Sequence, residues 1–352
     1  MAEGWARHAP DDELVLRPMS DGGPGFVEVV AEATDAELLD IHTTGPLGQD
    51  VTATIAMVDD TAYIEAAQAC GLQLVPGKVR NPGHTTCFGV GQLIAAAVDA
   101  GASRIVVGLG GSATNDGGAG MLAALGAVAD GPLDAGGGPL RTLTRVDIEA
   151  ARETVAGVEL VAASDVDNPL LGMRGATRIF APQKGATPEQ VETLEAALGN
   201  FAELVGRAPN GKDPALAAGA GAAGGLGYAL AQLGARRVPG ITTVAEIVGL
   251  PTLTAQADLV ITGEGRFDWQ SLHGKVVSGV AAIALDRARP CIVLAGEVIV
   301  GRRDYSAIGV TGAYSASDTV GSVAQSMAQP AEALAATAER VARTWSRRNS
   351  ST

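Results

Sequence analysis

Acidic, cationic and hydroxyl side chains gather in one short segment of this chain, residues 263–275, which read GEGRFDWQSLHGK. The segment directly follows an apolar run, DLVIT, that is typical of a buried strand. A carboxylate placed there can accept the proton of an attacking hydroxyl, and a lysine can neutralise a phosphate in transfer. We predict these two catalytic roles for Asp268 and Lys275. The alternative is a salt-bridged surface loop without chemistry.

A second segment, residues 108–120 (GLGGSATNDGGAG), follows a predicted strand and opens a predicted helix. In an open α/β sheet this position is the carboxyl edge, where ligands bind. Glycines let backbone N–H groups turn inward around an anion, and a helix N-terminus adds about half a positive charge. We therefore predict a phosphate-binding loop, although the segment matches neither a Walker A motif nor the dinucleotide fingerprint. The predicted contacts are Gly110, Gly111, Ser112, Thr114, Asn115 and Asp116; the alternative is a glycine-rich turn in which Asn115 or Asp116 caps the helix.

Two aspartates follow another predicted strand, in residues 164–170 (SDVDNPL). In an extended chain Asp165 and Asp167 point to the same side, because side chains alternate along a strand. Two such carboxylates can hold Mg²⁺ or grip substrate hydroxyls. The alternative is an Asx turn closed by Asn168 and the proline after it. Lys184, in the stiff turn of residues 180–185 (FAPQKG), is equally compatible with phosphate contact and with simple solvation.

Two weaker signals complete the set of candidate motifs. Asp21 lies in a glycine turn, SDGGPG, whose spacing indicates no more than a turn. Residues 219–224 match GxGxxG before a helix, which would fit a nicotinamide dehydrogenase. Residues 214–218 do not form a strand pattern, so the dinucleotide interpretation fails its structural requirement.

The elements that must position these residues follow an α/β pattern, in which short β-branched runs alternate with alanine-rich helical stretches. The predicted strands are 104–108, 158–162, 258–262 and 291–295. The predicted helices are 90–100, 117–125, 188–205, 226–233 and 330–345.

Composition narrows the class of partner. Lys and Arg total 25 against 39 Asp and Glu, a formal net charge of -14, which argues against nucleic acid and anionic membrane as partners. The three cysteines fit neither a disulfide framework nor a zinc motif and favour a reducing compartment. With no apolar run of membrane length and no leader pattern at the start, we expect a cytoplasmic protein.

In this order, the segments resemble the bacterial type of glycerate kinase. The resemblance runs from about Asp21 to the strand near Leu294 and rests on these stretches: DGG (21–23), TGPLG (44–48), GLGGSATNDGGAGML (108–122), SDVDNPLLG (164–172), APQKGA (181–186), GAGAAGGLG (219–227) and DLVITGEGRFDWQSLHGK (258–275). It implies that ATP and Mg²⁺ are used to phosphorylate D-glycerate by direct in-line transfer. No other partner is implied, and a homodimer is left open.

The resemblance also implies a fold and a set of roles. Residues 1–65 plus 285–352 would form a Rossmann-like domain, and 66–284 a second α/β domain inserted into it, with the site in the cleft between them. Asp165 and Asp167 would place Mg²⁺, which adds Asp165 to the catalytic residues. As a working hypothesis from the chemistry of these side chains, we expect substrate contacts from Asp21, Arg266, Lys184, Asn168 and Glu264, with Arg266 or Lys184 pairing with the glycerate carboxylate.

The beginning of the chain departs from the family pattern. Members usually open with an apolar strand and an Asp-Ser-Phe-Lys-Gly loop before a helix. This chain begins MAEGWAR, which looks like the middle of that helix, so we expect the strand and the lysine loop to be absent. The alternative function is therefore a relative that binds glycerate or nucleotide without turnover.

Overall fold

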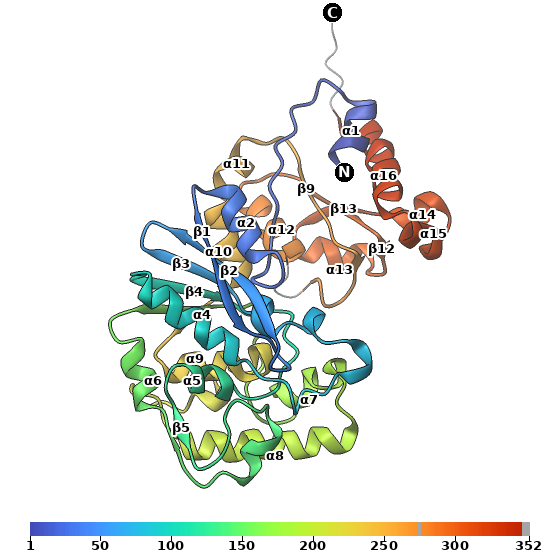
Figure 1. The fold of residues 1–352 in the computed structure, drawn as a ribbon. Helices are drawn as coiled ribbons and strands as arrows, with labels where there is room; N and C mark the ends of the chain where they lie inside the picture. Colours follow the sequence, from blue (N-terminus) through green and yellow to red (C-terminus); the bar gives the residue numbers. More distant parts are fainter. Residues whose placement is uncertain (273–275, 347–352) are drawn as a thin grey trace, which may run out of the picture. The chain divides into compact units, whose positions relative to one another are not determined.

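A computed structural model describes residues 1–272 and 276–346 (Figure 1). The chain divides into two compact units: an inserted unit, Ser20–Val244, and a terminal unit built from Met1–Met19 and the residues from Ala245 onward. An α/β fold in which one unit is made from both chain ends and the other is inserted is thus confirmed. The boundaries differ from those expected at 65/66 and 284/285, because residues 20–65 fall in the inserted unit and 245–284 in the terminal one.

The inserted unit is organised around a six-stranded sheet in the order β1-β2-β3-β4-β7-β8. Strands β3, β4, β7 and β8 are parallel, whereas β1 and β2 continue the sheet from β3 as antiparallel neighbours. The strands are β1 (Glu37–Thr44), β2 (Asp50–Val58), β3 (Thr61–Glu65), β4 (Arg104–Gly108), β7 (Glu159–Ala163), β8 (Arg236–Val238) and, in a separate pair, β5 (Val128–Ala129) and β6 (Val146–Asp147). The helices are α2 (Phe26–Ala33), α3 (Ala66–Cys70), α4 (Phe88–Asp99), α5 (Ala119–Ala124), α6 (Glu149–Thr154), α7 (Ala176–Phe180), α8 (Pro188–Val205) and α9 (Leu226–Gln232), and α10 (Gly240–Ile247) crosses the boundary.

Alternating side chains on the strands cover both faces of this sheet. Ile64 and Ile105 point into the main core, which α4, α5 and α9 complete with residues such as Leu93. Tyr63 points to the opposite face, where the ring of Phe26 from α2 packs edge-on against it, with ring centroids 6.1 Å apart. Figure 1 shows α2 on one side of the sheet and α4, α5 and α9 on the other. Because the helices cover the two faces of the sheet, the loops lie at the carboxyl ends of its parallel strands.

The terminal unit contains a second, smaller parallel sheet in the order β13-β11-β9 and a parallel pair, β10 and β12. Its strands are β9 (Val260–Thr262), β10 (Arg266–Phe267), β11 (Cys291–Ala295), β12 (Glu297–Val298) and β13 (Val310–Ser315). Its helices are α1 (Ala2–His8), α11 (Leu250–Gln256), α12 (Val276–Asp286), α13 (Arg302–Ala307), α14 (Ala316–Val320), α15 (Val323–Ala328) and α16 (Pro330–Trp345). No helix within the two described stretches of the chain is both long and apolar enough to cross a bilayer.

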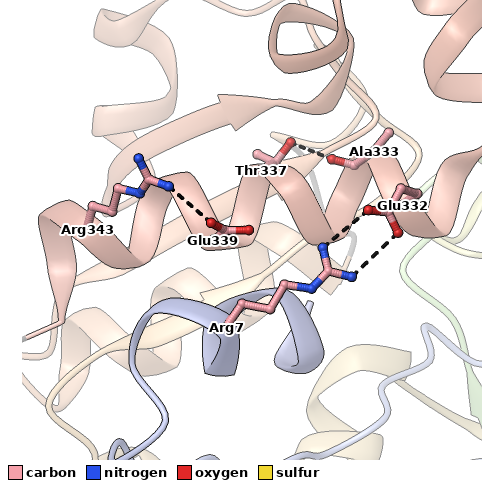
Figure 2. Close-up of polar contacts among 6 residues, drawn as sticks. All are labelled: Arg7, Glu332, Ala333, Thr337, Glu339 and Arg343. Atoms are coloured by element: carbon pink, nitrogen blue, oxygen red, sulfur yellow. Dashed lines mark hydrogen bonds and ion pairs between the residues drawn. The ribbon is translucent and has the colours of Figure 1, made fainter.

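Helix α1 packs along α16 and joins the two ends of the chain. Trp5 is buried with Ile292 and Leu294 of β11 against α16. Figure 2 shows Arg7 reaching across to Glu332, at 3.2 Å, on the exposed side of the contact. This exposed ion pair contributes little, so apolar burial holds the two helices together.

The closeness of the two helices gives a stability prediction. A Cβ on Gly4 would lie 2.0 Å from the carbonyl oxygen of Ala335, so Gly4→Ala should lower the free energy of unfolding by about 1–3 kcal/mol. Gly199, on α8, has no atom within 4 Å of the corresponding position. Gly199→Ala should therefore stabilise the protein by about 0.5–1 kcal/mol. Urea unfolding of both variants is the measurement, and equal stabilities would contradict the packing.

Candidate functional site

A single glycine turn covers the carboxyl edge of the inserted unit's sheet. We call Asp21, Gly22 and Gly23 the DGG turn. A Cβ on Gly22 would lie 2.9 Å from the carbonyl oxygen that ends β7, and one on Gly110 would lie 2.6 Å from the Cα of Gly23. Gly22 also has a φ of 88°, a conformation that other residues rarely adopt. The turn therefore lies directly on the ends of β4 and β7.

Buried polar groups anchor the DGG turn on both sides. Glu65, the last residue of β3, accepts the amides of Gly25 and Phe26, both at 2.9 Å, at the start of α2. Its carboxyl is buried, and this desolvation raises its pKa. On the other side the hydroxyl of Ser20 accepts the amide of Gly22 at 3.2 Å. These hydrogen bonds on both sides of the turn fix the position of Asp21.

Asp165 lies next to Asp21. Its Oδ2 accepts the amide of Ile241, at 3.2 Å, in the first turn of α10. A Cβ on Gly240 would lie 2.1 Å from the backbone carbonyl oxygen of Asp21 and 3.3 Å from Oδ2 of Asp165, so the backbone of Asp21 and the carboxylate of Asp165 both lie against Gly240. Burial, followed by smaller effects that include the charge of Asp21, raises the pKa of Asp165 to about 6. The edge therefore carries a pair of carboxylates in a partly desolvated setting.

Asp167, the other predicted metal ligand, has a different partner. Its Oδ1 lies 2.8 Å from Nη2 of Arg237, in an ion pair. The chain is not extended after β7, because the hydroxyl of Ser164 accepts the amide two residues on, at 3.2 Å. The structure thus brings Asp165 together with Asp21 and places Asp167 beside an arginine.

Asn168, predicted to contact substrate, is engaged with its own loop. Its Nδ2 donates to the carbonyl oxygen of Arg174 at 2.7 Å, and its backbone carbonyl accepts the amide of Gly221 at 2.9 Å. The side chain therefore holds together the loop that joins β7 to α7.

Most of the predicted phosphate loop is committed to protein contacts. The amides of Ala113, Asn115 and Gly117 donate to carbonyl oxygens of neighbouring segments at 2.7–3.2 Å. Gly111 is exposed and Gly110 half-buried, and both lie beside the DGG turn. Any phosphate contact in this loop thus falls on these two glycines.

The polar side chains later in this loop are buried. Asp116 Oδ2 accepts the amide of Cys87 at 2.9 Å, and its Oδ1 accepts the amide of Gly118, the N-cap of α5, at 3.2 Å. Thr114 Oγ1 and Asn115 Oδ1 are buried without a hydrogen-bond partner in the described part of the chain. These residues shape the loop from inside.

Lys184 supports the same loop from behind. Its side chain is buried at the end of a short 3-10 helix (Pro182–Lys184). Its Nζ donates to Ser112 Oγ at 2.9 Å and to the carbonyl oxygen of Thr114 at 2.7 Å. Burial lowers the pKa of this lysine to about 8, although the charge of Asp116 opposes the shift. This geometry suits a residue that positions the loop.

The candidates of the terminal unit lie in the loop after β9. Asp268 forms a local turn in which its Oδ1 accepts the amide of Gln270 at 2.8 Å and its amide donates to the hydroxyl of Ser271 at 3.1 Å. Its side chain is half-buried. Lys275, the predicted phosphate-neutralising cation, lies outside the described residues.

Arg266 and Glu264 lie at the carboxyl edge of the terminal unit's sheet. Arg266 Nε is 3.1 Å from Oε2 of Glu297, an ion pair that links β10 to β12. The backbone carbonyl of Glu264 accepts the amide of Gly296 at 3.2 Å. Arg266 is therefore already paired with an acid at this edge, Glu297.

Asp21 and Asp165 are the side chains best suited to a divalent cation. No three His, Cys, Asp or Glu side chains cluster as a metal site among residues 1–272 and 276–346. Mg²⁺, however, is usually held through one or two carboxylates, with waters and substrate phosphates as its other ligands. Two adjacent carboxylates, one with a raised pKa, fit that requirement.

Two residues of this edge were not predicted from the sequence. Glu65 ends the short run TAYIE. An acid at the end of a strand lies at the carboxyl edge of the sheet, so its position was the one signal available in the sequence. Arg237 lies in β8, the strand that pairs with β7. This strand is only three residues long and gives no recognisable sequence pattern. Neither side chain could be assigned a partner without the fold.

Comparisons with known proteins agree with this architecture. A model of the "Glycerate kinase family" matches residues 1–346. A glycerate kinase of Haemophilus influenzae is 42% identical, over 97% of this chain and 92% of its own, and a glycerate 2-kinase of Escherichia coli is 45% identical, over 84% and 79%. The crystal structure of a Salmonella typhimurium LT2 protein assigned as glycerate kinase 2 has a TM-score of 0.76 and 40% identity, covering 97% of this chain and 91% of that one. The resemblance is confirmed: this chain belongs to the glycerate kinase family.

Proposed function

We propose that this chain transfers the γ-phosphate of ATP to a hydroxyl of D-glycerate in the presence of Mg²⁺. The substrate follows from the relatives named glycerate kinase. The observation that carries the proposal is the placement of Asp21 and Asp165 at the carboxyl edge, where half-buried Gly110 packs against the DGG turn and is followed by exposed Gly111. Carboxylates beside a glycine backbone are what a metal-bound triphosphate requires.

The residues contribute mainly by position. Mg²⁺, when bound, neutralises charge on the phosphate oxygens. Asp21 and Asp165 would hold it, and the backbone of half-buried Gly110 and exposed Gly111 would contact the phosphates. Direct in-line transfer needs orientation and neutralisation of charge and no covalent intermediate. In the terminal unit, Asp268 is assigned to accept the proton of the attacking hydroxyl.

The proposal is tested by a coupled assay with D-glycerate, ATP and Mg²⁺. We expect ADP release that depends on both substrates and on the metal. Coupling through enolase, with and without phosphoglycerate mutase, identifies which hydroxyl is phosphorylated. Binding of glycerate or nucleotide, measured by thermal shift, without any ADP release would instead support a non-catalytic relative.

Neutralising either carboxylate should remove the metal site and leave the fold intact. Asp21→Asn and Asp165→Asn keep an oxygen that can accept the same backbone amides. We expect each to lower kcat about a hundredfold or more and to raise the Mg²⁺ concentration needed for half-maximal rate. Asp35→Asn, at an exposed position of the same unit, is the control. A wild-type Mg²⁺ dependence in both variants would contradict the assignment.

Lys184→Met tests the supporting role of that lysine. The carbonyl of Thr114 would lose its buried donor, at a cost of about 1–3 kcal/mol in unfolding free energy, whereas exposed Lys78→Met should cost almost nothing.

The unfolding free energy lost in Lys184→Met should also depend on pH. The pKa of Lys184 is about 8 in the folded chain and higher once unfolded, so the unfolded state binds more protons between these values. Wild-type stability relative to Lys184→Met should therefore rise by roughly 1.4 kcal/mol per pH unit above pH 8, up to the unfolded pKa. Urea unfolding across this range gives the difference, and a constant gap would rule out a depressed pKa.

A further inference from the structure

An acidic substrate needs a cation at an edge that is itself acidic. The carboxyl edge of the inserted unit carries Asp21, Asp165 and Asp167, and the chain has a formal net charge of -14. Of the cations predicted from sequence to pair with the substrate carboxylate, Lys184 is buried behind the glycine loop. The other, Arg266, is paired with an acid of the terminal unit. Lys184 therefore supplies no cation at this edge, and Arg266 is accounted for within its own unit.

Arg237 does lie at this edge, and its side chain is held in place. It is the central residue of β8, and its Nε donates to the backbone carbonyl of Ser164 at 3.2 Å. A Cβ on Gly219 would lie 2.4 Å from its Cδ, so the arginine stem lies across the glycine backbone.

The partner of Arg237 is easily displaced. The Asp167 side chain is 73% exposed, whereas that of Arg237 is 30% exposed. An ion pair with such an exposed acid contributes only about 0–1 kcal/mol, because water screens it and the side chain loses little by leaving. The guanidinium is thus oriented and yet open to exchange of its carboxylate partner.

Arg237 also lines a small cavity. Its volume is about 40 Å³, and its walls include Ala162, Ser164, Gly219 and Ala231 together with Arg237. Its small lining residues leave room for only a few heavy atoms. The space suits one end of a short acid.

We propose that Arg237 binds the carboxylate of the hydroxy acid substrate and that Asp167 orients the guanidinium until the substrate replaces it. The inference rests on the proposed function for the identity of the acid. A guanidinium binds a carboxylate through two parallel N–H donors, which fixes orientation as well as affinity. Asp167 is then a positioning residue and not a ligand of the metal.

Arg237→Gln and the adjacent Arg236→Gln form a matched pair. Arg236 points to the other face of the strand, where it pairs with Glu159 at 2.8 Å. We expect Arg237→Gln to raise the KM for glycerate roughly ten- to a hundredfold and to leave the KM for ATP within about twofold. Arg236→Gln should change neither. Arg237→Lys keeps the charge without the fork and should fall in between.

Asp167→Asn separates the two roles open to that acid. As the residue that orients the guanidinium, Asp167 affects glycerate binding alone, so its replacement should raise the KM for glycerate by a few-fold and leave the Mg²⁺ requirement unchanged. A hundredfold loss of kcat in Asp167→Asn, or a raised KM for ATP in Arg237→Gln, would overturn the assignment.

Calorimetric titration of glycerate without ATP keeps this inference separable from the proposed function. If wild-type protein binds glycerate through Arg237 but releases no ADP, the kinase function fails and the binding site stands. If wild-type protein phosphorylates glycerate and Arg237→Gln binds it normally, the binding site fails alone. Circular dichroism and the melting temperature confirm that each variant is folded.

Discussion

The DGG turn packs on the sheet more closely than any side chain would allow, and this contact organises the inserted unit's edge. A Cβ at Gly240 or Gly110 would overlap the turn, so glycine is required on both sides of it. Because the main chain packs directly on main chain, Asp21 lies near Asp165 although the two residues are far apart in the sequence. Main-chain packing therefore sets the positions of these two aspartates.

Behind this edge, buried polar groups supply rigidity. Glu65 ties the start of α2 to β3, and Lys184 and Asp116 both hold the glycine loop through buried hydrogen bonds. Buried charges with hydrogen-bond partners specify one arrangement, since any rearrangement would leave a charge unpaired in an apolar setting. Phosphoryl transfer depends on such preorganised positions.

Local pattern predicted the strongly periodic elements well. Strands β4 and β11 and helices α8 and α16 have the bounds expected from sequence, because each combines a clear apolar period with a distinct start. The hairpin of β1 and β2 was assigned to the wrong side of a domain boundary, since only its pairing with β3 reveals its sheet. For the candidate site, the post-strand position predicted that Asp165 and Asp167 act together. The pairing of Asp167 with Arg237 instead depends on a turn at Ser164 that the sequence does not reveal.

If the packing of the DGG turn places the two carboxylates proposed to bind the metal, Gly240→Ala tests this most directly. Its added methyl group would press on the carbonyl of Asp21 without altering either aspartate. Titration of Mn²⁺ into this variant, followed by electron paramagnetic resonance in the presence of ATP, should show metal affinity at least tenfold weaker than in the wild type, with circular dichroism unchanged. Wild-type Mn²⁺ affinity in Gly240→Ala would contradict the account.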